Sequence, residues 1–198
     1  YISVTGVQTC ALPISGGRAP GKELGFGHIF RSLNLATNFR KHNILFLLED
    51  YGGAKEIIET HGFNIVTMKK YSTLKHDICI TKNIIKKHDV DVLILDSYKV
   101  NNRYLKELTK FTKTVLVTDL KMIHYSADLI VNGFIGFTNK KFTRNSTQYL
   151  LGPRYQILNN QFSRHNYSQK KKYDLLVTFG GYDENNITEL FLQELIKF

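Results

Sequence analysis

The feature that most constrains the fold is an alternation of short apolar runs with helical segments. Runs with the length of buried strands cover residues 43–49, 63–68, 90–95, 114–118 and 129–132. Between them, helical patterns cover residues 54–60, 73–88 and 102–111. Strands that alternate with helices in this way form a parallel sheet with helices on both faces. The sequence therefore predicts an α/β fold.

A glycine-rich turn precedes a further helix that begins at His28. Gly25 and Gly27 flank Phe26 at the point where a loop becomes this helix, and Arg31 follows one turn later. Glycines there let a ligand come close to the backbone, and a helix N-terminus attracts anions. A histidine beside a bound phosphate can exchange a proton near neutral pH. The alternative is a pair of loop glycines with a surface histidine.

Polar residues follow the predicted strands at the points where these end. They are Glu49, Asp96, Ser97, Tyr98, Asp119 and Asn132. In parallel sheets ligands lie beyond the carboxyl ends of the strands, so these residues and the Gly25–His28 turn predict one site. The alternative for any single one of them is that it caps the following helix.

The first residues of the chain do not fit this pattern. Residues 4–14 have no period and no charge, and they resemble the translation of a sequencing adapter. A signal peptide is excluded because there is no basic start and no continuous apolar core. We therefore expect residues 1–20 to be a non-native leader. The N-terminal domain is then expected over residues 21–162, without its first strand.

Composition narrows the possible partners. The formal charge is +10, but the lysines are spread along the chain, which argues against nucleic acid and favours an anionic small molecule. No run of about eighteen apolar residues exists to span a membrane. With Cys10 in the leader, Cys79 is the only cysteine, which is typical of a reducing cytoplasm. We expect no metal site, because the histidines lack HxxxH or HExxH spacing.

The C-terminal part predicts the start of a second domain. Residues 163–172 are polar and basic, as in a linker, and residues 173–179 form a strand pattern. Gly180 and Gly181 follow, and a helix is expected from Ile187 to the last residue. A strand, a glycine turn and a helix N-terminus together make a loop that can bind phosphate.

Four motifs in this order resemble the PseG family and the related SpsG-like proteins. They are Gly25-x-Gly27-His28-x-x-Arg31, Leu95-Asp96-Ser97-Tyr98, Leu150-Leu151-Gly152-Pro153-Arg154-Tyr155 and Val177-Thr178-Phe179-Gly180-Gly181-x-Asp183-x-Asn185. The GxGH motif alone is also shared with GT-B glycosyltransferases of the MurG type. The resemblance implies a GT-B fold of two Rossmann-like domains with the active site between them.

The resemblance also implies an activity. PseG-type enzymes hydrolyse a UDP-linked 2,4-diacetamido-2,4,6-trideoxy hexose of the pseudaminic acid pathway to UDP and free sugar, with inversion and without a metal or another cofactor. Carried over to this sequence, the catalytic residues are His28, Asp96 and Tyr98. The expected substrate-binding residues are Gly25, Gly27, Arg31, Asp119, Asn132, Gly180, Gly181, Asp183 and Asn185.

Two departures from the family pattern lead to further expectations. Adapter-like sequence stands where the family has its first strand, and the family's later serine and glutamate motif would fall beyond Phe198. We therefore expect the chain as given to be marginally stable and inactive by itself. We also expect it to be a monomer. The alternatives for the parent protein are a glycosyltransferase that uses a UDP-sugar donor and a non-catalytic module that binds sugar nucleotides or polysaccharide.

Overall fold

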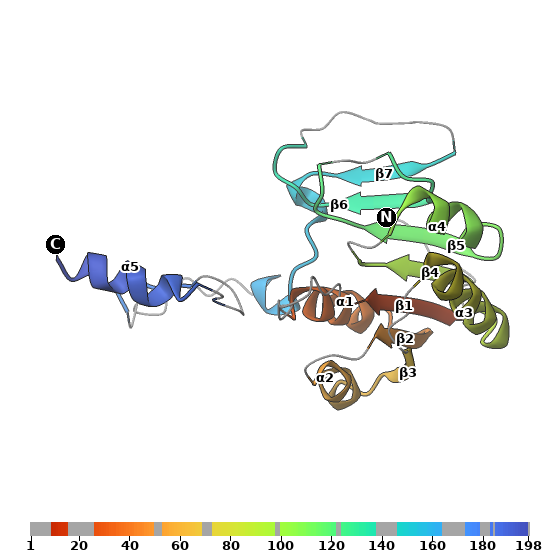
Figure 1. Cartoon of the computed structure of the whole chain (residues 1–198), viewed down its shortest axis with the longest axis horizontal. Coiled ribbons are helices and arrows are strands. Elements are labelled where there is room, and N and C mark those ends of the chain that lie inside the picture. The colour runs from red at the N-terminus through yellow and green to blue at the C-terminus, as the bar shows by residue number, and fades with distance from the viewer. Residues whose placement is uncertain are drawn as a thin grey trace.

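The computed structural model describes residues 9–15, 26–49, 53–68, 73–97, 100–121, 124–137, 146–163, 173–178, 183 and 185–197. Within them, seven strands form one parallel sheet in the order β3-β2-β1-β4-β5-β6-β7 (Figure 1). The strands are β1 (Thr9–Ser15), β2 (Asn43–Glu49), β3 (Asn64–Met68), β4 (Val92–Leu95), β5 (Lys113–Val117), β6 (Leu129–Asn132) and β7 (Gln148–Leu151).

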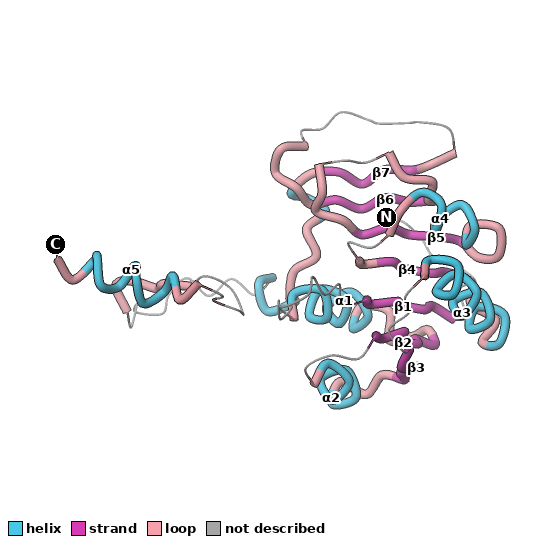
Figure 2. Tube along the Cα trace, viewed as in Figure 1, coloured by secondary structure: helices cyan, strands magenta, loops and turns pink. Residues whose placement is uncertain are grey.

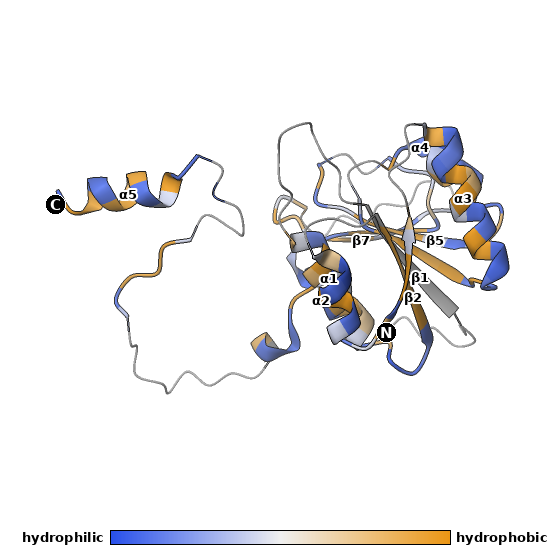
Figure 3. Cartoon of the chain, turned by 60° about the horizontal axis from the view of Figure 1, so that its bottom comes forward, coloured by the Kyte–Doolittle hydropathy of each residue, from blue (hydrophilic) through white to orange (hydrophobic). Residues whose placement is uncertain are grey.

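Helices cover both faces of the sheet, as the alternation predicts. One face carries α1 (Gly27–Thr37) and α2 (Ala54–Thr60), and the other carries α3 (Leu74–Lys87) and α4 (Asn102–Leu108) (Figure 3). After β7 come two short 3-10 turns, η1 (Pro153–Tyr155) and η2 (Asn160–Ser163), and then α5 (Ile187–Leu195) (Figure 2). The expected α/β fold is confirmed.

The core has two layers because side chains alternate along each strand. In β2, Phe46 and Leu48 pack with Ile29 and Leu33 of α1 on one face. Leu47 of the same strand packs on the other face, within the layer that α3 and α4 cover. All five of these side chains are buried. The packing of α1 against β2 is what fixes the start of that helix at the edge of the sheet.

The position of β1 differs from our expectation that the sheet lacks its first strand. Thr9–Ser15 lies between β2 and β4, in the place that a missing strand would leave open. Any extended apolar segment can satisfy the backbone groups that β2 and β4 present there. Pro13 has no N–H to donate, and the pairing with β4 involves only Cys10 and Ala11. That residues 1–20 are non-native stays a prediction.

The strand expected over residues 173–179 is not formed in the part of it that is described. Residues 173–178 have no strand assignment, and Tyr173, Leu175 and Leu176 are exposed. A strand needs a neighbour to complete its hydrogen bonds, and no pairing reaches this segment. The expected helix is present as α5, with no buried residue. Most of the expected linker, from residue 164 to 172, lies outside the described residues.

Candidate active site

The first helix places two of the predicted residues side by side. His28 and Arg31 are three residues apart in α1, so they lie on the same face of the helix. The helix begins at Gly27 without a side-chain cap. Within the part of the chain that the structure describes, a Cβ built at Gly27 would meet nothing within 4 Å. The fold itself does not require a glycine there.

Asp96 follows β4 and joins both of these side chains. Its Oδ1 lies 2.7 Å from His28 Nδ1, and Arg31 donates from Nε to Oδ2 at 2.8 Å and from Nη2 to Oδ1 at 2.5 Å. The Asp96 side chain is only 3% exposed, whereas those of His28 and Arg31 are 14% and 17% exposed. Burial alone would raise the pKa of Asp96, but the hydrogen bonds from His28 and Arg31 and the Arg31 charge hold this pKa below its usual value.

The ionised state of Asp96 determines where the proton of His28 lies. An ionised carboxylate can only accept hydrogen bonds, so the short contact with Asp96 requires a proton on His28 Nδ1. The contact of 3.2 Å between Arg31 Nη2 and His28 Nδ1 is then one between two donors. In neutral His28 the other ring nitrogen, Nε2, is therefore the proton acceptor. This is the tautomer that a general base needs.

Arg31 connects the ends of two neighbouring strands. Besides Asp96 after β4, it reaches Asp119 after β5, with Nη2–Oδ1 and Nη1–Oδ2 distances of 3.3 and 3.2 Å. Burial would lower the pKa of Arg31, but the hydrogen bond and charge of Asp96, followed by those of Asp119, raise it. Because two carboxylates share this guanidinium, Arg31 is engaged within the protein. It orients the site, and a substrate phosphate would have to compete with both partners for it.

A cavity of about 270 Å³ lies beside this cluster. Arg31, Thr118 and Asp119 line it on one side, and Tyr155 and Gln156 line it on the other. We did not predict Gln156 as a site residue. The sequence feature that could have indicated Gln156 is Gly133, which comes directly after β6. A Cβ at Gly133 would lie 2.9 Å from the Gln156 Cα, so only a glycine allows this close approach. The glycine therefore lets the segment after β7 approach the site.

Asn132 lies at the same edge of the sheet, but its side chain forms hydrogen bonds with the backbone of two loops. It is fully buried, donates from Nδ2 to the Leu120 carbonyl at 2.8 Å and accepts from the Phe134 N–H at 2.9 Å. It fastens the loop after β5 to the loop after β6. A role in substrate binding stays a prediction.

The predicted residues of the C-terminal segment show no bond to the His28 cluster among the described contacts. Asp183 accepts hydrogen bonds from the N–H groups of Ile187 and Thr188 at 2.8 and 2.7 Å and so caps α5. The bonds from Thr188, followed by that from Ile187, lower its pKa. Asn185 is exposed. Gly25, Tyr98, Gly180 and Gly181 lie outside the described residues, as does the side chain of Glu49.

Two further findings concern the described residues as a whole. They contain no group of three or more His, Cys, Asp or Glu side chains arranged to hold a metal ion. None of their helices has the length and apolar character needed to cross a membrane.

Comparison with known proteins finds relatives in sequence and in structure. No family model matches the chain. The uncharacterized protein MJ1062 of Methanocaldococcus jannaschii is 30% identical over 190 residues, which is 88% of this chain but only 38% of that protein. The chain thus spans well under half of this relative.

The solved structures that resemble the chain include a MurG and a protein in complex with UDP-glucose. Acinetobacter baumannii MurG is similar with a TM-score of 0.50 at 11% identity, over 71% of this chain and 44% of that one. Anabaena HepE in complex with UDP-glucose has a TM-score of 0.44 at 14% identity, over 62% of this chain and 36% of that one. The likeness to MurG shows the fold alone. The chain contains a Rossmann-like domain of the GT-B type.

Proposed function

We propose that the protein hydrolyses a UDP-linked diacetamido-trideoxy hexose to UDP and free sugar, as the four PseG-like motifs imply. The observation that carries the proposal is His28, whose Nδ1 is held by buried Asp96 at the glycine-flanked start of α1. This arrangement provides a base at the carboxyl edge of a parallel sheet, where ligands bind in such folds.

The geometry suggests how the reaction proceeds. Nε2 of His28 takes a proton from a water molecule as the water oxygen bonds to the anomeric carbon. The bond from that carbon to the UDP oxygen breaks, and its electron pair leaves with the diphosphate. Asp96 stabilises the imidazolium that forms, and attack opposite to the leaving group inverts the configuration. Diphosphate is a weak base, so its departure needs no strong general acid.

A glycosyltransferase is the second candidate, and the fold shared with MurG favours it. A sugar hydroxyl would then replace the water, and the cavity beside Asp119 would hold part of the acceptor. A non-catalytic module that binds sugar nucleotides is the third candidate. In each case we propose a cytoplasmic monomer that needs neither metal nor nucleic acid.

The decisive experiment uses protein expressed from the intact locus. UDP release is followed by phosphorus NMR with the UDP-sugar alone and then with added sugar acceptors. Release without acceptor, reduced about a hundredfold or more in His28→Ala but not in the control His61→Ala, supports hydrolysis. His61 is an exposed histidine at the end of α2 and is not part of the cluster. Release only with an acceptor identifies a transferase, and saturable binding without release identifies a binding module.

A further inference from the structure

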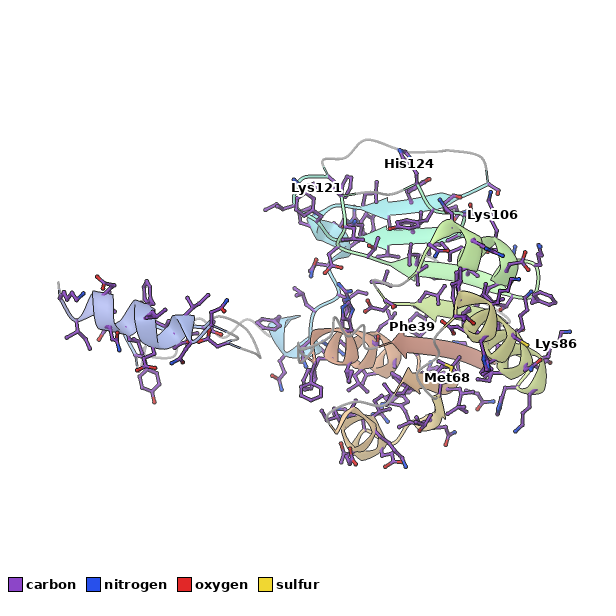
Figure 4. All side chains as sticks on the ribbon, viewed as in Figure 1. Phe39, Met68, Lys86, Lys106, Lys121 and His124 are labelled. Atoms are coloured by element: carbon purple, nitrogen blue, oxygen red, sulfur yellow. The ribbon has the colours of Figure 1, made fainter. Side chains whose placement is uncertain are left out.

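A second cavity lies on the face of the sheet opposite to α1. It has a volume of about 510 Å³, within the range of small-molecule sites. Its walls are α4, the segment 124–128 before β6 and the beginning of β7. It shares no lining residue with the cavity beside Arg31. Figure 4 labels Lys106 and His124, which belong to two of these walls.

The walls of this cavity are tied together by hydrogen bonds. Asn102 of α4 donates to the His124 carbonyl at 2.9 Å and accepts from the Ser126 N–H at 2.8 Å. The segment 124–126 is thereby held against α4. At the other end of the segment, the Asp128 carbonyl accepts from the N–H of Gln148 in β7 at 2.8 Å. The cavity is therefore bounded by fixed backbone on these sides.

The lining is rich in hydroxyl groups, which suits a ligand that carries hydroxyls itself. The side chains that bring these groups are Ser126, Ser146, Thr147 and Tyr149. Thr109 also lines the cavity, but its hydroxyl donates to the carbonyls of Leu105 and Lys106. Hydroxyl groups both donate and accept hydrogen bonds, so they match the hydroxyls of a sugar.

The charges in the cavity favour an anion. Asp128 accepts from the Thr114 N–H and Oγ1 at 2.9 and 3.0 Å and pairs with Lys113 at 3.2 Å. Burial would raise the pKa of Asp128, but these bonds hold it below its usual value. Its negative charge is therefore compensated. Lys106 has no ion pair among the described residues, so its positive charge remains for a ligand.

We propose that this cavity binds the phosphate monoester of a sugar, with the phosphate at Lys106 and the sugar among the hydroxyl groups. Lysine binds phosphate as a point charge, and the hydroxyls of Ser126 and Thr147 hydrogen-bond the sugar. The site is separate from the proposed hydrolytic site and does not depend on the activity proposed there.

The test measures binding of glucose 1-phosphate to protein from the intact locus by calorimetry and by amide NMR signals. We expect saturable binding that shifts the Ser126 and Thr147 signals. Lys106→Ala should weaken it about tenfold or more, because a charged hydrogen bond is lost. Thr147→Val should weaken it less. The control Lys87→Ala removes an exposed lysine from the end of α3, and His28→Ala alters the other site. Both should bind as the wild type does.

Several outcomes would overturn the proposal. The first is the absence of saturable binding of glucose 1-phosphate. The second is equal affinity for it in Lys106→Ala and the wild type. The third is that the shifted amide NMR signals are confined to residues around His28. Binding of inorganic phosphate or of glucose as tight as that of the ester would also contradict it, because the site would then not recognise both parts of the ligand.

Discussion

Replacing Asp96 by Asn tests the electrostatic account of the site. The carboxylate receives three N–H groups while almost fully buried, at 2.7 Å from His28 and at 2.8 and 2.5 Å from Arg31. Removing one partner of a buried ion pair costs about 3–5 kcal/mol. The Asn keeps the shape and one acceptor oxygen, and Arg31 keeps Asp119. We therefore expect Asp96→Asn to lower the free energy of unfolding by about 2–4 kcal/mol.

Asp119→Asn is the matched control because it makes the same chemical change in the same cluster. The Asp119 side chain is half exposed, and its contacts with Arg31 are 3.2 and 3.3 Å long. Exposed ion pairs contribute about 0–1 kcal/mol, so the loss should be within that range. Urea unfolding at pH 7, followed by circular dichroism, measures both variants. A loss in Asp119→Asn that equals or exceeds the loss in Asp96→Asn would refute the reasoning.

The pH dependence of stability gives this prediction a second readout. Because the folded pKa of Asp96 lies below its unfolded value, its contribution to stability is complete above the unfolded pKa, about 4, and is lost as the pH falls through the folded pKa. The difference between wild type and Asp96→Asn should be full at pH 7 and shrink below about pH 4. A difference that stays constant down to pH 2 would show that the pKa of Asp96 is the same in the folded and the unfolded protein, which would contradict the account.

Three further predictions concern other parts of the chain. Gly27→Ala should fold normally, because a Cβ there meets nothing within 4 Å, but calorimetry should show weaker binding of the UDP-sugar; unchanged binding would show that no ligand approaches this turn. Asp183→Ala should increase amide hydrogen exchange at the start of α5, because two N–H groups lose their acceptor; unchanged exchange would contradict the cap. Resequencing the locus should replace residues 1–20 by a different sequence, and finding them in the genome would show that β1 is native.

The sequence predicted those strands and helices correctly that pack against neighbouring elements of the fold. The predicted ranges 43–49 and 54–60 coincide with β2 and α2, because an apolar run and a helical pattern are both bounded there by turn residues. The range 173–179 has an equally clear strand pattern but no neighbouring strand in the described residues. Periodicity reports which residues would be buried in a sheet, and it does not report whether a partner is present.

The candidate site could be predicted in part. The ends of the predicted strands indicated that Asp96 and Asp119 lie at one edge of the sheet, and helical spacing indicated that His28 lies beside Arg31. That Arg31 is shared between the two carboxylates was not predictable, since it depends on the distance between β4, β5 and the start of α1. For Asn132 the pattern could not separate a ligand-binding amide from one that fastens two loops. Both uses place a polar side chain after a strand.

The central claim is that His28 acts as the base in the hydrolysis of a UDP-sugar. The most direct measurement follows a UDP-linked diacetamido-trideoxy hexose by NMR with protein from the intact locus and no acceptor. We predict that UDP and the inverted free sugar appear together, at a rate reduced about a hundredfold or more in His28→Ala, whose fold should be intact. UDP release in His28→Ala at the wild-type rate would contradict the account, as would a wild-type protein that releases no UDP until an acceptor is added.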